Sequence, residues 1–165
     1  MVSFPHALMV GSRPADGTTM VLRLTLFVIP ALALAGLDLL VKARVTTTVW
    51  NYHHRSFAWS VLALVWLVLL LLVALLPSKR SAVAAGAVAG GVLGNVVSAY
   101  QHGGRVPNPL VTADAAFNLA DVWTLAGLPL LMIALARVAI RNRDSIDRFV
   151  PPRRWELALR RKLGL

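Results

Sequence analysis

The stretch FAWSVLALVWLVLLLLVALL, residues 57–76, is apolar apart from Ser60 and stops at Pro77. A helix needs about 20 mostly apolar residues to cross the hydrocarbon core of a bilayer. The stretch therefore predicts a membrane-spanning helix. The polar sequence Ser78-Lys79-Arg80 that follows predicts that this helix ends at a membrane surface.

Three further apolar runs surround this helix in the sequence, at residues 21–41, 82–97 and 117–140. Pro30 lies inside the first run, where neighbouring helices can satisfy the carbonyl that a proline leaves free. The sequence thus predicts an all-α membrane protein built as a bundle of four transmembrane helices.

We divide the chain accordingly into an N-terminal segment (1–20), a membrane domain (21–140) and a basic tail (141–165). We expect the first segment to be retained, because the apolar run after it is too long for a signal peptide and lacks a clear cleavage site.

Composition supports the membrane class. The chain has 165 residues, of which 58% are hydrophobic and 15% are charged. Its net charge of +10 would suit a nucleic-acid-binding domain, but the apolar excess is too large for a solvated surface of that kind. Because there is no cysteine, disulfides, Cys-ligated zinc and thiol catalysis are excluded.

The distribution of Lys and Arg predicts the orientation of the bundle. Thirteen of them lie in the N-terminal flank, the loop at 79–80 and the segment from residue 137 onward, against four in the other two loops. Loops rich in Lys and Arg stay in the cytoplasm. Both termini are therefore expected on the cytoplasmic side of the membrane, with the tail either lying on an anionic membrane surface or simply solvated.

The third run differs from the second because it is rich in small residues. Gly86, Gly90 and Gly94 recur every four residues, and Gly91 lies beside them. Such spacing lets helix backbones approach closely. We therefore expect this helix at the centre of the bundle, with Asn95 near its outer end needing a polar partner.

Polar groups within the spans are few and fall at similar depth. Asp38 lies near the outer end of the first span, Asn95 near that of the third, and Asn118 and Asp121 at the outer start of the fourth. Polar residues inside a membrane are costly and commonly functional, so these residues predict one outward-facing pocket. Two structural alternatives remain open: Asp38 can pair with Lys42 one turn away, and Asn118 and Asp121 can cap the fourth helix.

Three stretches of the chain resemble signal peptidase II, the prolipoprotein signal peptidase of bacterial membranes. Asp38-Leu39-Leu40-Val41-Lys42 is similar to the family's Asp-Gln-x-x-Lys, with Leu in place of Gln. Gly90-Gly91-Val92-Leu93-Gly94-Asn95 resembles its Gly-Gly-x-x-Gly-Asn. Phe117-Asn118-Leu119-Ala120-Asp121 matches its Phe-Asn-x-Ala-Asp block, the most specific of the three.

The resemblance implies an aspartic endopeptidase of four spans that cuts a signal peptide before a lipid-modified cysteine. Its two carboxylates flank a water, one ionised and one protonated. It implies a lipid-modified preprotein as substrate, a location in the bacterial cytoplasmic membrane, and no metal or cofactor. We further expect membrane lipid as a partner, no nucleic acid, and action as a monomer.

One of the two acids is missing at its family position. The family continues Gly-Asn-x-x-Asp-Arg, whereas this chain has Ser98 and Ala99 there. A serine hydroxyl cannot replace a carboxylate as general base. Asp114 is the nearest replacement in sequence, but on one continuous helix it would lie about 10 Å from Asp121. Asp38, on another helix, is the other candidate.

Two functions therefore remain open. In the first, the chain is an endopeptidase of full or impaired activity, with Asp121 and Asp114 as catalytic acids. In the second, it is a non-catalytic relative that binds a lipoprotein signal segment or lipid. In both, the expected binding or orienting residues are Asn95, Asn118, Asp38, Lys42 and Ser98.

Two less favoured functions complete the set. His53, His54 and His102 lie in the outer loops and could hold a haem or metal, but no carboxylate or cysteine completes a ligand set. A small exporter would need a coupling acid in mid-span. Asp38 and Asp121 lie too near the interface for that role.

Overall fold

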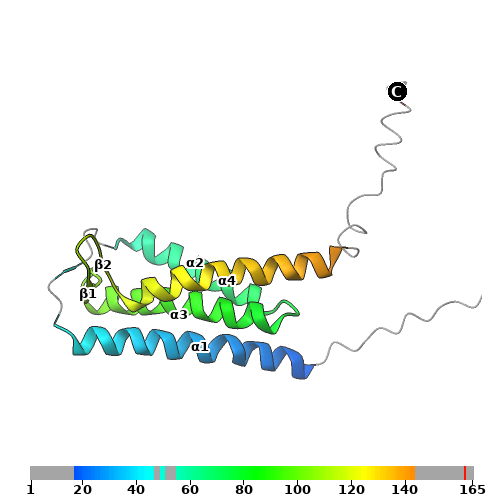
Figure 1. Cartoon of the computed structure of the whole chain (residues 1–165), viewed down its shortest axis with the longest axis horizontal. Coiled ribbons are helices and arrows are strands. Elements are labelled where there is room, and N and C mark those ends of the chain that lie inside the picture. The colour runs from blue at the N-terminus through cyan, green and yellow to red at the C-terminus, as the bar shows by residue number, and fades with distance from the viewer. Residues whose placement is uncertain (1–16, 47–48, 51–54, 144–161, 163–165) are drawn as a thin grey trace, which may run out of the picture.

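A computed structural model describes residues 17–46, 49–50, 55–143 and 162 of the chain. It contains four long helices, and all four are long and apolar enough to cross a membrane. The prediction of a four-helix membrane bundle is thus confirmed, and the chain is a multi-pass membrane protein. The helices are α1 (Gly17–Arg44), α2 (Phe57–Ala74), α3 (Lys79–Gln101) and α4 (Leu119–Arg141) (Figure 1).

The helix starts are set by local capping. Ser56 precedes α2 and its hydroxyl accepts a hydrogen bond from the Trp59 N–H, while Ser78 does the same for the Ser81 N–H at the start of α3. Such side chains satisfy backbone N–H groups that a helix leaves without partners. Capping by Ser78 starts α3 three residues before the predicted run at 82–97, and the helix continues past Ser98 to Gln101.

Helix α3 is the centre of the bundle. It packs extensively against α1 and α4 and to a lesser extent against α2, whereas α1 makes little contact with α2 or α4. In the most apolar 18-residue stretch of α3, 61% is buried, against 17–22% in the corresponding stretches of the other three helices. The central position predicted from its small residues is therefore confirmed.

Glycines bring the α3 backbone against its neighbours. A Cβ atom on Gly86 would collide with the Phe27 carbonyl of α1, and one on Gly91 would collide with the Thr124 hydroxyl and Ala120 carbonyl of α4. Helices in a membrane associate largely through such close van der Waals packing. The two glycines thus hold α1 and α4 on different faces of α3.

A short β-hairpin connects α3 to α4, which an all-α expectation does not include. Strand β1 (Leu110–Val111) pairs antiparallel with β2 (Ala116–Phe117), with Leu110 opposite Phe117. The chain reverses before it at Gly103 and Gly104, whose φ angles of 59° and 87° suit glycine.

The two connections at this end of the bundle are tied together. The Asn108 N–H donates to the Val49 carbonyl at 3.0 Å, and Trp50 forms a β-bridge with Pro107. The hairpin lies beside the end of α1 and the start of α4 (Figure 1). It therefore covers the end where the polar residues of the spans were predicted to meet.

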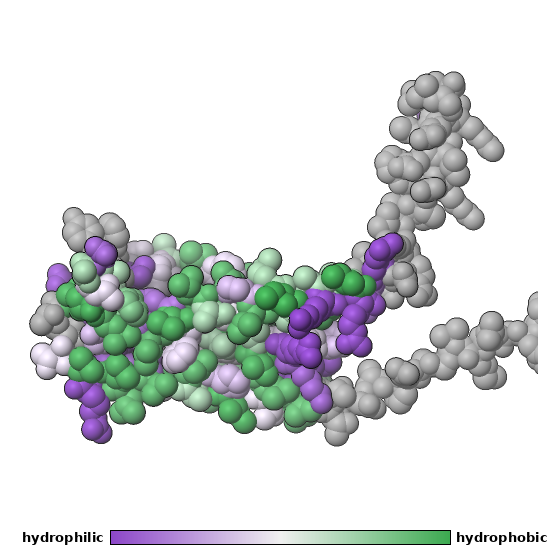
Figure 2. Space-filling view, in the orientation of Figure 1, coloured by the Kyte–Doolittle hydropathy of each residue, from purple (hydrophilic) through white to green (hydrophobic). Residues whose placement is uncertain are grey.

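Apolar side chains cover the flanks of the bundle, and hydrophilic ones gather at its ends (Figure 2). Large exposed apolar residues occur on all four helices, among them Leu32, Leu72, Val83 and Leu130. In a soluble protein this much exposed apolar surface would favour aggregation. In a bilayer it faces lipid.

We expect Gly86→Ala to lower the free energy of unfolding by about 1–3 kcal/mol, because the added methyl group forces α1 away from α3. Unfolding in mixed detergent micelles measures the change. Gly36→Ala on α1 is the matched control, since a Cβ there meets nothing within 4 Å and alanine favours a helix. Equal effects of the two substitutions would contradict this packing.

The orientation is tested by labelling, for which the absence of native cysteine is an advantage. We expect a membrane-impermeant maleimide to label Ala113→Cys, in the hairpin turn, in intact cells. Asn142→Cys, just after α4, should be labelled only after permeabilisation. The reverse pattern would place the termini outside.

Candidate functional site

Polar side chains of α1, α3 and α4 form one continuous network at the hairpin end of the bundle. The Lys42 ammonium lies 2.7 Å from Asp38 Oδ2 and donates to Asn95 Oδ1 at 3.0 Å. Asn95 Nδ2 in turn donates to Asp121 Oδ1 at 3.0 Å. An ammonium only donates and a carboxylate only accepts, so a bridging amide satisfies both in this orientation alone.

Asp38 connects α1 to the start of α4. Its carboxylate is fully buried, and Oδ1 accepts a hydrogen bond from the Ala120 N–H at 2.9 Å. The first N–H groups of a helix lack partners within the helix and favour negative charge nearby. The ion pair with Lys42 that the sequence left open is therefore present. Asp38 also accepts a hydrogen bond from the first turn of α4, which the sequence did not reveal.

Asn118 and Asp121 form a capping box at the start of α4. The Asp121 N–H donates to Asn118 Oδ1 at 3.1 Å, and the Asn118 N–H donates to Asp121 Oδ2 at 3.3 Å. This reciprocal arrangement satisfies two backbone donors and fixes the rotamer of Asp121. The capping of α4 that the sequence left open is therefore also present. The Asp38–Lys42 pair and the Asn118–Asp121 pair both stabilise the bundle, and they also meet at one depth.

Asn108 is a member of the network that the sequence did not single out. Its Oδ1 accepts from Asn118 Nδ2 at 2.8 Å, and its own Nδ2 donates to the Ala116 carbonyl at 3.3 Å. It lies in a loop between Pro107 and Pro109, outside any helical or alternating pattern. Its proximity to Asn118 arises only when the hairpin folds back over α4.

A cleft of about 550 Å³ opens beside the network, between α2, α3 and α4. Asn95 and Asp121 line it, and Asp121 is exposed there. Arg55 also lines it, with its guanidinium 4.8 Å from the centre of the Trp59 ring. The remaining walls are mostly apolar: Trp59, Leu62, Ala63, Trp66, Val92, Thr124, Leu125 and Leu128.

Of the predicted site residues, Asp38, Lys42 and Asn118 lie in the network without lining the cleft, and two others belong to neither. Asp114 lies exposed in the turn of the hairpin, with no hydrogen bond or ion pair to any residue the structure describes. Ser98 is fully buried in α3, and its hydroxyl has no partner among the described residues. The cleft is therefore lined by Asp121 as its one carboxylate from the described part of the chain.

Asp121 retains capacity for a ligand. An ionised carboxylate has about four lone-pair positions, and hydrogen bonds from Asn95 and Asn118 occupy two of them. The rest are available to N–H or O–H groups in the cleft. The site can thus bind a polar group at the end of an apolar molecule.

The histidines considered for cofactor binding do not assemble in the part of the chain that the structure covers. His102 packs against Trp50, and its Nδ1 lies 2.8 Å from the Ser98 carbonyl. His53 and His54 lie outside the described residues. Among the residues described, no three His, Cys, Asp or Glu side chains are grouped as metal ligands.

We expect Lys42→Met to lower the free energy of unfolding by about 3–5 kcal/mol, because it leaves the buried Asp38 carboxylate without its counter-charge. The double substitution Asp38→Asn with Lys42→Met should recover part of this loss. Arg44→Met, an exposed cation two residues away, is the control and should have little effect. The free energy of unfolding is measured in detergent. Equal losses in Lys42→Met and Arg44→Met would contradict the buried pair.

Comparisons with known proteins give a fold. No family model matches the sequence, and no curated protein matches it. Two solved structures described as bacterial membrane enzymes are similar to it. One is 18% identical with a TM-score of 0.51, over 66% of this chain and 86% of that one. The other is 17% identical with a TM-score of 0.46, over 73% of this chain and 94% of that one. On the first of these likenesses, the chain has the fold of a bacterial membrane enzyme.

Proposed function

We propose that this chain binds the signal segment of a lipid-modified preprotein in the cleft between α2, α3 and α4, and that it does so without cutting it. The proposal places the chain in the cytoplasmic membrane of a bacterium, acting as a monomer and without a metal or cofactor. Asp121, with Asn95 beside it, is the residue that would contact the segment.

The composition of the cleft supports an apolar ligand that carries a polar group. Its walls consist largely of tryptophan, leucine and valine side chains, and Asn95 and Asp121 lie at its hairpin end. A signal segment is apolar along most of its length and polar where it meets the mature protein. Backbone N–H groups there need acceptors near the membrane, and Asp121 offers free lone pairs.

The observation that carries the proposal is that no other carboxylate of the described residues lines the cleft with Asp121. Asp38 is fully buried, is bound by Lys42 and the Ala120 N–H, and does not line the cleft. Two carboxylates that activate one water must reach it together, directly or through one further water. An acid already neutralised by a buried ammonium is a poor general base.

Endopeptidase activity is the second candidate, favoured by the fold. The structural neighbour with a TM-score of 0.51 is described as a bacterial membrane enzyme, and the Phe-Asn-x-Ala-Asp block that resembles signal peptidase II is intact through Asp121. This candidate needs a second acid at the cleft when substrate is bound. Asp114 would have to supply it by movement of the hairpin.

A photo-crosslinker tests the binding site. With benzophenone-alanine at position 128, in the cleft, we expect crosslinks to a diacylglyceryl-modified preprotein in membrane vesicles. The same probe at position 32, on the lipid-facing side of α1, should give few. Asp121→Ala should weaken binding about 10- to 100-fold through loss of a charged hydrogen-bond acceptor, and Asp114→Ala should not.

The same substrate separates the two candidates. Binding without any cleaved product by the unmodified protein is the expected result. Cleavage that is lost in Asp121→Asn and kept in Ala113→Ser would establish the endopeptidase, and loss in Asp114→Asn as well would identify the second acid. Equal crosslinking at positions 128 and 32 would remove the cleft as the binding site.

A further inference from the structure

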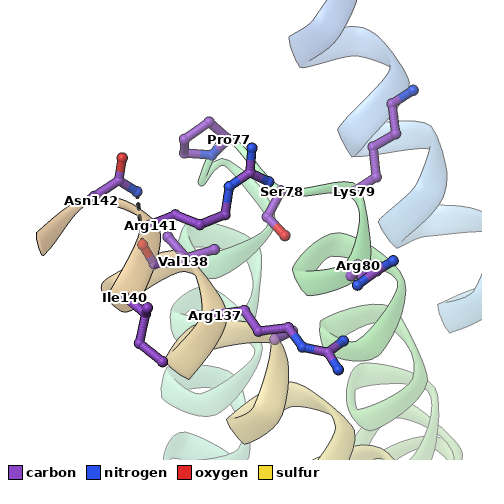
Figure 3. A pocket seen from close by; sticks show the side chains of 10 residues that line it. Pro77, Ser78, Lys79, Arg80, Arg137, Val138, Ile140, Arg141 and Asn142 are labelled. Carbon is purple, nitrogen blue, oxygen red and sulfur yellow. Dashed lines mark hydrogen bonds between the residues drawn. The ribbon is translucent and has the colours of Figure 1, made fainter.

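A second cavity, of about 720 Å³, lies at the opposite end of the bundle from the cleft. It is formed by the turn between α2 and α3 and by the last turns of α4 (Figure 3). Four cationic side chains line it: Lys79, Arg80, Arg137 and Arg141. Hydrophilic side chains gather on the surface where α4 ends (Figure 2).

These cations have no counter-charge in the part of the chain that the structure describes. The acids there are Asp38, Asp114 and Asp121, which belong to the network and the hairpin at the other end. None of the four cations forms an ion pair with a described residue. The start of α3 adds the partial positive charge of a helix N-terminus. The cavity is therefore suited to a phosphate group.

An apolar groove continues from this cavity along the bundle. It has a volume of about 520 Å³ and shares Lys79, Arg80 and Arg137 with the cavity. It runs between α1 and α4, which contact each other little, over the small side chains of α3. Its apolar lining consists of Leu26, Val83, Ala84, Ala87, Leu130, Ile133 and Ala134.

We propose that the cavity and groove together bind an anionic phospholipid, with its phosphate among the four cations and an acyl chain in the groove. Basic pockets between transmembrane helices on the cytoplasmic side bind anionic headgroups in this way. A free phosphate would use the cavity and leave the groove empty. A lipid fits both, because the cations lie where the apolar groove begins, as a headgroup lies at the start of its chain.

This site is separate from the cleft of the proposed function. The two share no lining residue, and they lie toward opposite ends of α3. Substitutions at one are therefore expected to leave ligand binding at the other unchanged.

The test uses the full chain in a zwitterionic or non-ionic detergent. Native mass spectrometry would measure binding of phosphatidylglycerol and of phosphatidylcholine with the same acyl chains. We expect phosphatidylglycerol to bind at least tenfold more tightly. Arg80→Gln with Arg137→Gln should weaken it about 30-fold, at about 1 kcal/mol for each cation removed. Arg44→Gln with Arg105→Gln, which removes equal charge at the other end, should have little effect.

The groove is tested independently. Val83→Trp should block it and weaken phosphatidylglycerol binding about tenfold or more, while Val68→Trp, on a lipid-facing position of α2, should not. Both valines are exposed, so folding is not at risk from burial.

Three results would overturn the proposal. Equal affinity for the two lipids would remove the anionic site. Binding of inorganic phosphate as tight as that of the lipid, unaffected by Val83→Trp, would assign the cavity to free phosphate. The third result concerns Asp144 and Asp147, which follow α4 and lie outside the described residues. If the protein preferred phosphatidylglycerol only after both were changed to Asn, the cavity would be assigned to the tail.

Discussion

The buried pair of Asp38 and Lys42 is the interaction on which the arrangement of the other helices depends. Both charges lie in a region of low dielectric, so each must be satisfied completely. Asp38 does this by accepting from the Ala120 N–H of α4, and Lys42 by donating to Asn95 of α3. Together with the hydrogen bond from Asn95 to Asp121, the pair therefore fixes the relative positions of α1, α3 and α4.

The same network fixes the orientation of the two polar side chains that line the cleft, Asn95 and Asp121. Asn95 is oriented by the ammonium on one side and presents its amide N–H to Asp121 on the other. In the capping box, the Asn118 N–H donates to the second oxygen of Asp121. A carboxylate fixed by two donors presents its remaining lone pairs in constant directions, as a binding residue should. In the proposed function the same two oxygens of Asp121 that accept hydrogen bonds from Asn95 and Asn118 would also bind the ligand, through their remaining lone pairs.

Much of this was predictable because membrane depth restricts where polar groups can lie. The lengths of the apolar runs and the alternating direction of the helices place Asp38, Asn95, Asn118 and Asp121 at one level. The contribution of Asn108 and the exposure of Asp114 were not predictable, because both depend on the hairpin. Its strands are two residues long, and their pairing with the first outer loop is a contact between segments far apart in sequence.

The other three helices are unequally attached to α3, and this has a mechanical consequence. At Gly86 and Gly91 the α3 backbone lies directly against α1 and α4, whereas α2 has the weaker contact with α3. α2 forms one wall of the cleft, and it forms no hydrogen bond with another helix among the residues that the structure describes. Of the three walls of the cleft, α2 is therefore the one least firmly held, and a tilt of this helix is the movement that would open the cleft directly to the surrounding lipid.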